Sequence, residues 1–196
     1  DPSYIHAHVD YLFTAMNDQR YHRINGNPVL NIYDPRNIPN FSDYISIYKD
    51  LFLKKYGLDI HLRVTLKDFR DLMFVEENRS MIDSVYEYQP YFANHASFFA
   101  HYLYEMQLRF NRDVLKNMTV FSANNIVRKI SKGKKKILDL PYGYGVYTGW
   151  DTTPRWGSKG ILHLGMTRDL FQNQIKSATK KAVDSDFIVV TAWNEW

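Results

Sequence analysis

The chain has 196 residues, of which 45% are hydrophobic and 23% are charged, a balance typical of a folded globular protein. It contains no apolar run of about 18 residues or more, so we expect no integral membrane segment. Cysteine is absent, which excludes disulfides, thiolate metal sites and cysteine nucleophiles. The formal net charge is +4, but much of the excess lies in one lysine-rich turn at residues 132–136. Since no nucleic-acid-binding motif accompanies it, we expect no nucleic acid partner.

The first half of the chain alternates strand and helix patterns. A short apolar strand is predicted at residues 28–33, after a turn at 25–27. The apolar residues that follow have helical spacing from Ser42 to a stop signal at Gly57. Two further strands are predicted at 58–64 and 81–87.

The second half continues the alternation. Residues 95–112 are aromatic-rich with helical spacing, and they form either a covering helix or part of a helical insertion at about 91–135. Tyr142-Gly-Tyr-Gly145 lacks the Lys-Ser/Thr ending of a phosphate loop, so we predict a turn there and a strand at 145–151. A helix starting at Thr167 leads into a last strand that begins at Phe187.

This order of elements predicts the fold class. Strands separated by helices imply parallel strands joined by right-handed crossovers. We therefore predict an α/β protein with a partial (β/α)8 TIM-barrel-like fold, in one domain over residues 1–196. There are too few strands to close an eight-stranded barrel, and the chain begins at Asp1 without an initiator Met. We expect a fragment of a larger domain, whose uncovered edges and apolar faces favour self-association.

Several strand ends carry motifs of one family. Gly-Trp-Asp-Thr-Thr-Pro-Arg at 149–155, His-Leu-Gly-Met-Thr at 163–167 and Ala-Trp-Asn-Glu-Trp at 192–196 resemble the WbsX glycosyltransferase-like family. Residues 23–33 and 83–87 resemble family segments further upstream. The resemblance covers most of the chain and is weakest at 91–125. It implies a barrel related to family 99 glycoside hydrolases, of which this chain would be the C-terminal half.

The resemblance also implies an activity. We expect an enzyme that transfers or cleaves a glycosidic bond in polysaccharide metabolism of the lipopolysaccharide or O-antigen type, which favours a cytoplasmic location. Its partner would be an oligosaccharide or polysaccharide. Glu195 matches the first Glu of the hydrolases' catalytic pair, and the second would fall beyond Trp196. The alternative is a barrel that binds glycans without catalysis.

The chemistry independently requires two carboxylates, because one group protonates the leaving oxygen while another assists on the opposite face of the sugar. Within the chain, the strand-end carboxylates that could join Glu195 are Asp34, Glu87 and Asp151. The residues predicted to bind substrate share a position at or near strand ends. They are Tyr33, Glu87, Trp150, Asp151, Arg155, Trp193 and Asn194.

Each of these residues has a structural alternative. Asp151 could cap the turn that follows it, Glu87 and Asp34 precede proline-containing turns, and the tryptophans could be core residues. His61 and His163 lie on strand-like segments, where a buried structural imidazole is commoner than a ligand. We find no metal-ligand spacing between histidines and carboxylates, and therefore expect no metal and no other cofactor.

Overall fold

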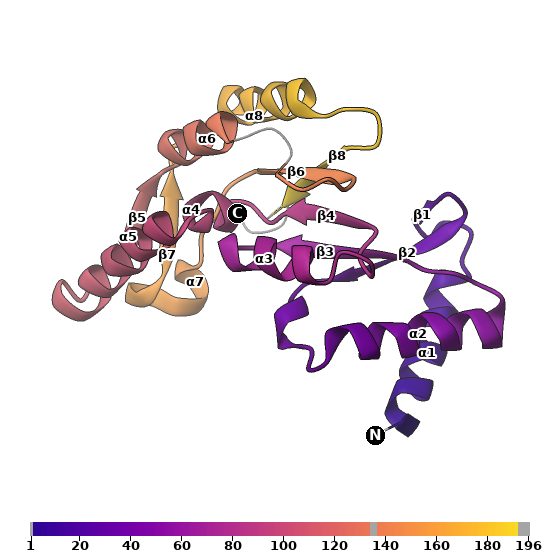
Figure 1. Cartoon of the computed structure of the whole chain (residues 1–196). Coiled ribbons are helices and arrows are strands. Elements are labelled where there is room, and N and C mark those ends of the chain that lie inside the picture. Colours follow the sequence, from indigo (N-terminus) through magenta and orange to yellow (C-terminus); the bar gives the residue numbers. More distant parts are fainter. Residues whose placement is uncertain (1, 134–136, 192–196) are drawn as a thin grey trace. The chain divides into compact units, whose positions relative to one another are not determined.

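The computed structural model describes residues 2–133 and 137–191 and shows an α/β chain (Figure 1). The chain divides into two compact units. The N-terminal unit comprises Asp1–Thr65 and Phe74–Val85, and the C-terminal unit comprises Leu66–Met73 and Tyr86–Trp196. The boundaries fall within β3 (His61–Leu66), α3 (Phe69–Glu77) and β4 (Ser84–Glu87).

The N-terminal unit has strands in the order β1-β2-β3-β4. Its other elements are α1 (Pro2–Met16), β1 (Arg23–Ile24), β2 (Asn27–Ile32), the 3-10 helix η1 (Pro35–Asn37) and α2 (Phe41–Tyr56). Asn25 and Gly26 join β1 to β2 with φ angles of 51° and 84°. Two positive φ angles in a two-residue loop are typical of the type I′ hairpin, and β1 and β2 are accordingly antiparallel. β2 then pairs in parallel with β3, from Val29 beside His61 to Ile32 beside Val64.

Apolar residues of α1 and α2 form the core of this unit. Val9 and Met16 pack with Tyr48, Phe52 and Ile60, and all five are buried. The helix predicted from 42 to 57 is confirmed. It ends at Gly57, whose left-handed conformation lets its N–H reach the last carbonyls of α2. Ser42, predicted to cap this helix, lies within its first turn instead: α2 begins at Phe41, and the Ser42 hydroxyl donates to Asn78 Oδ1.

The C-terminal unit has two groups of strands, β4-β6-β8 and β5-β7. Its helices are α4 (Tyr91–His95), α5 (Phe98–Arg109), the π-helical turn η2 (Phe110–Val114), α6 (Ala123–Lys132), α7 (Thr153–Trp156), the 3-10 helix η3 (Gly157–Lys159) and α8 (Arg168–Lys181). Its strands after β4 are β5 (Thr119–Ser122), β6 (Tyr142–Tyr147), β7 (Ile161–Leu164) and β8 (Phe187–Thr191). β6 pairs in parallel with β8, and β5 in parallel with β7.

Helices α6 and α8 lie side by side and α8 packs against β6 (Figure 1). The apolar residues of α6 fall at helical spacing, so that Ile126, Val127 and Ile130 are buried against Tyr147 of β6. Thr167 caps α8 by accepting the N–H of Leu170 at 3.2 Å, as the predicted start of this helix requires. Among the described residues, no helix combines the length and the apolar character needed to cross a bilayer.

The predicted α/β class with mostly parallel strands and crossover helices is confirmed. The turn predicted at Tyr142–Gly145 is wrong, because these residues form most of strand β6. A Cβ on Gly145 would lie 2.3 Å from the Glu87 carbonyl oxygen, so this glycine permits β4 and β6 to approach closely. Residues 91–132 contain α4, α5, β5 and α6. Their interpretation as an insertion in a single domain stays a prediction.

Candidate functional site

The carboxyl ends of β4, β6 and β8 meet at one edge of the C-terminal unit. Tyr147 at the end of β6 lies beside Thr191 at the end of β8. The Thr191 hydroxyl is buried, 2.5 Å from the Gln89 carbonyl oxygen and 3.0 Å from that of Val146. This contact holds the chain just after β4 against the ends of the other two strands. The segments that follow β4 and β6 therefore start from the same edge, where β8 ends.

The segment after β6 lines a cavity of about 220 Å³, which we call the tryptophan pocket. Trp150 is half-buried in it, and its ring meets Tyr88 edge to face with centroids 6.4 Å apart. Trp156, on α7, is 58% exposed and also lines the pocket. Flat aromatic faces beside polar groups suit the stacking of a sugar ring. Other lining residues include Tyr91, Tyr104, Glu105, Thr152 and His163.

His163, on β7, is the most unusual polar residue of the tryptophan pocket. It is buried, and Phe121 and Tyr147 meet its ring edge to face at 5.7 Å each. Burial lowers the pKa of its imidazole from 6.5 to about 4, with a smaller contribution from Lys129. Neither ring nitrogen has a hydrogen-bond partner among the described residues. A neutral imidazole has one donor and one acceptor, and among the described residues both stay buried and unpaired here.

The Asp151 side chain caps the turn that leads into α7. Its Oδ1 accepts hydrogen bonds from the backbone N–H of Thr153 at 2.8 Å and from the Thr153 hydroxyl at 2.6 Å. These bonds hold the pKa of the Asp151 carboxyl below its usual range. The capping alternative is therefore what the structure shows, and substrate binding by Asp151 stays a prediction. Arg155 is exposed on α7, next to Trp156.

Glu87 is held in a buried hydrogen-bond network. The Tyr142 hydroxyl donates to its Oε1 at 2.9 Å, and the Gln89 amide donates to its Oε2 at 3.0 Å. The backbone N–H of Gly145 reaches the same Oε2 at 3.4 Å. Burial raises the pKa of the Glu87 carboxyl, against the opposing effect of these donors. Glu87 is absent from the lining of the tryptophan pocket, and it lines a different cavity of about 400 Å³ with Gln89 and Lys129.

The other predicted site residues are not brought together by the described structure. Tyr33 follows β2 in the N-terminal unit and is 54% exposed. Trp193, Asn194 and Glu195 lie outside the described residues. Another cavity, of about 560 Å³, is lined by α5, β5 and α6, and none of the predicted residues lines it.

Sequence reasoning missed the roles of His163, Tyr91 and Trp156 as pocket residues. His163 lies in one of the family-like motifs, but only the packing of rings around it shows that its nitrogens lack partners. The described residues also bring together a set of side chains able to hold a metal ion, His95, His101 and Glu105. Of these three, only Glu105 lines the tryptophan pocket.

The family model described as "Glycosyltransferase WbsX" matches residues 1–196, which is the whole chain. No curated protein matches the sequence.

Solved structures resemble the fold. A glycoside hydrolase-like protein aligns with a TM-score of 0.59 and 13% identity, covering 98% of this chain and 51% of its own. The GH99 endo-alpha-mannosidase from Bacteroides thetaiotaomicron aligns with a TM-score of 0.55 and 17% identity, covering 100% of this chain and 50% of its own. The chain thus spans about half the length of these structures. At such identities the likeness shows the fold alone, and it confirms the predicted partial barrel.

Proposed function

The chain belongs to the glycosyltransferase WbsX family, and from this we propose that it forms part of an enzyme that makes or cleaves a glycosidic bond in a glycan chain. The family match over the whole sequence is the observation that carries the proposal. The tryptophan pocket supports it, since aromatic faces beside polar side chains suit a ligand made of rings and hydroxyls. The alternative of a glycan-binding barrel without catalysis is not favoured by a family of glycosyltransferases.

Glu195 is the proposed catalytic carboxylate. It is four positions after Thr191, whose hydroxyl contacts hold the end of β8 at the edge from which Trp150 also follows. Strand ends at such an edge carry the chemistry of (β/α) barrels. The reaction needs a second carboxyl group. Both Glu87 and Asp151 already accept hydrogen bonds within the protein, which favours instead the second Glu of the hydrolases' pair, whose position would fall beyond Trp196.

The remaining roles follow from position and charge. Trp150 and Trp193 would stack on sugar faces, while Asn194 and Tyr33 would contact sugar hydroxyls. Arg155, exposed beside Trp156, would hold an anionic substituent or a diphosphate leaving group. The likeness to an endo-alpha-mannosidase makes alpha-linked manno-oligosaccharides the first substrates to test.

Glu195→Gln tests the proposal in the protein encoded by the complete gene. The substitution keeps size and hydrogen bonding but removes the charge and basicity. We expect turnover to fall by about 100- to 10,000-fold, the usual value of acid-base assistance, while glycan affinity is retained. Products are followed by mass spectrometry, with manno-oligosaccharides alone for hydrolysis and with sugar nucleotides added for transfer.

Glu76→Gln is the matched control, because Glu76 is an exposed carboxylate of α3. It should leave turnover unchanged. Equal turnover in Glu195→Gln and wild type would remove Glu195 from the mechanism. A wild-type protein that binds glycans but converts none of the substrates would support the binding-only alternative.

A further inference from the structure

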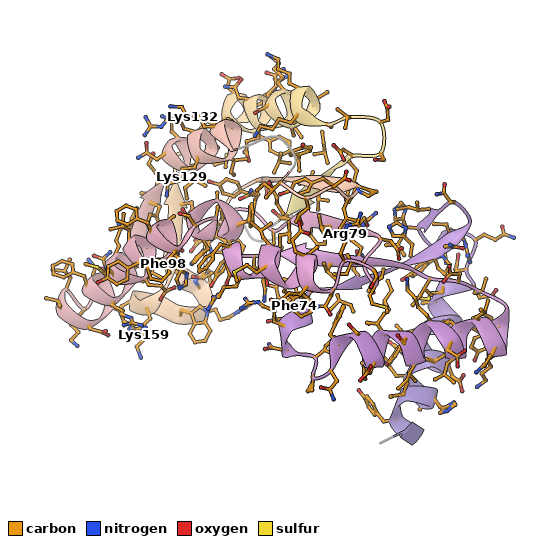
Figure 2. The ribbon with its side chains drawn as sticks, in the orientation of Figure 1. Phe74, Arg79, Phe98, Lys129, Lys132 and Lys159 are labelled. Atoms are coloured by element: carbon orange, nitrogen blue, oxygen red, sulfur yellow. The ribbon has the colours of Figure 1, made fainter. Side chains whose placement is uncertain are left out.

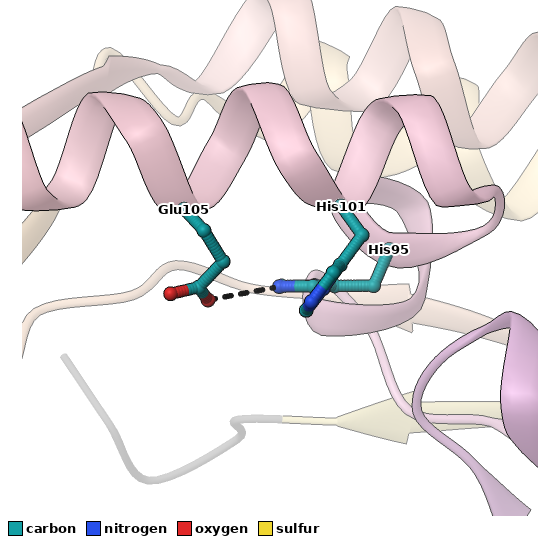
Figure 3. A group of neighbouring side chains, drawn as sticks. All are labelled: His95, His101 and Glu105. Carbon is teal, nitrogen blue, oxygen red and sulfur yellow. Dashed lines mark ion pairs between the residues drawn. The ribbon is translucent and has the colours of Figure 1, made fainter.

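Three side chains with metal-ligand atoms converge where α4 meets α5 (Figure 3). His95 is the last residue of α4, and His101 and Glu105 lie on α5. Residues four apart share one face of a helix, so His101 and Glu105 both point toward His95. One ligand atom from each residue lies within 4.8 Å of the other two. The distance from His95 Nε2 to Glu105 Oε1 is 3.7 Å.

The orientation and tautomer of His95 are determined by its surroundings. Its Nδ1 lies 2.8 Å from the Tyr91 carbonyl oxygen, and since a carbonyl only accepts, Nδ1 must carry the proton. The Tyr91 ring stacks on the imidazole with centroids 4.0 Å apart, and Tyr104 meets it edge to face at 4.7 Å. With the Nδ1 proton directed at the Tyr91 carbonyl, the neutral ring carries no proton on Nε2. Nε2 therefore presents a lone pair toward Glu105.

This arrangement leaves electron-pair donors facing one another. Among the described residues, neither His95 Nε2 nor His101 Nδ1 has a hydrogen-bond partner, and both atoms are buried. A lone pair 3.7 Å from a carboxylate oxygen with no proton between them is unfavourable in a buried place. A cation between the three groups would satisfy all of them at once.

We propose that His95, His101 and Glu105 bind a zinc ion that links α4 to α5. Two imidazole nitrogens and one carboxylate oxygen form a usual zinc ligand set, with water in the fourth position. A hydrogen bond from the other ring nitrogen to a backbone carbonyl, as His95 makes to Tyr91, is the common support for such a ligand. Tetrahedral coordination requires ligand atoms about 3.3 Å apart, so from separations within 4.8 Å the ligand atoms must approach one another by at most about 1.5 Å. Glu105, 34% exposed, has room to do so.

The expectation that the chain holds no metal is revised by this proposal. The four-residue spacing of His101 and Glu105 is visible in the sequence, but the third ligand comes from another helix. The proposal does not depend on the proposed enzymatic function. Zinc binding is measured without any glycan, so the two can fail separately.

The test titrates zinc chloride into the 196-residue chain after removal of metals with a chelator. We expect calorimetry to show one bound zinc per chain and higher thermal stability with zinc present. Cobalt chloride should give the visible absorption of a tetrahedral site. His101→Ala and Glu105→Gln should each weaken zinc binding by at least about 100-fold, the upper range for loss of a supporting group alone.

His22→Ala is the control for adventitious binding, because His22 is an exposed histidine far along the sequence from the cluster. It should retain wild-type affinity. The proposal is overturned if the chain binds no zinc, or if both cluster variants bind it as tightly as wild type. It is equally overturned if nuclear magnetic resonance shows His95 doubly protonated at pH 7, since an ion pair with Glu105 would then fill the same place. If His101→Ala does not fold, the zinc affinity of Glu105→Gln alone tests the proposal.

Discussion

At the scale of single residues, burial controls the charge of His163 in the tryptophan pocket. His163 is 6% exposed and lies among rings, and neither solvent nor any hydrogen-bond partner in residues 2–133 and 137–191 stabilises a positive imidazole there. The unfolded chain has no such restriction. Folding therefore competes with protonation at this position.

This competition predicts a pH dependence of stability. The folded pKa of His163, about 4, lies below the unfolded value of 6.5, so the unfolded state binds the proton first as pH falls. Above the unfolded pKa the ring is neutral in both states, and the full free energy of unfolding is present. As pH falls toward the folded pKa, protonation of the unfolded state lowers the free energy of unfolding. We expect a loss of about 2 kcal/mol between pH 7.5 and pH 5. His163→Gln, which does not titrate, should lack this component.

Urea unfolding at pH 7.5, 6.5, 5.5 and 5 measures the effect as a difference between variant and wild type. Taking the difference cancels the contributions of other titrating groups, including Glu87. His22→Gln, at an exposed position, should follow wild type. Parallel curves for wild type and His163→Gln would mean that the imidazole becomes charged within the fold.

At the scale of elements, strand β6 depends on two glycines for its closeness to its neighbours. A Cβ at Gly145 would lie 2.3 Å from the Glu87 carbonyl oxygen and 2.6 Å from Gln89 Cγ. A Cβ at Gly143 would lie 2.5 Å from Tyr86 Cβ. Because the contact at Gly145 is with backbone, it cannot be relieved by a change of rotamer.

Gly145→Ala should therefore separate β4 from β6 and lower the free energy of unfolding by about 1 to 3 kcal/mol or more. Gly149→Ala is a matched control just after the same strand, since a Cβ there would meet nothing within 4 Å. It should change stability by less than about 0.5 kcal/mol. Urea unfolding compares the two variants. Equal free energies of unfolding for the two variants would show that β4 and β6 do not depend on close contact at Gly145.

At the scale of the whole molecule, the C-terminal unit exposes a row of apolar side chains on α5. Phe98 is 70% exposed and Phe99 69% exposed (Figure 2 labels Phe98). Tyr102, Leu103 and Met106 on the same helix are each about half exposed. Contiguous apolar surface of this kind favours association with another apolar surface.

We predict that the 196-residue chain self-associates through this surface. Sedimentation velocity should show oligomers at micromolar concentrations, and the double variant Phe98→Glu, Phe99→Glu should shift the distribution toward monomer. Tyr11→Glu is the control, because Tyr11 is equally exposed but lies on α1 in the N-terminal unit. A monomeric wild-type chain would contradict the prediction.

Local patterns by themselves determined the order and type of many elements. Helical spacing located α2, α5 and α8, Gly57 marked the end of one helix, and apolar runs located β2, β3, β4 and β8. These signals are properties of neighbouring residues, so they survive without knowledge of the fold. The strand-end motifs likewise indicated the family, which the match over residues 1–196 confirms.

Only the tertiary structure decided which side chains meet and what charge they carry. The glycines of β6 read as a turn because sequence alone does not show that β4 lies against them. Glu87 looks like a strand-end site residue until Tyr142, distant in the chain, is seen to donate to it. His95 joins His101 and Glu105 only because α4 packs on α5. The physical reason is common to all three: close contact and burial are set by residues far apart in sequence, and these determine strain, hydrogen bonding and pKa.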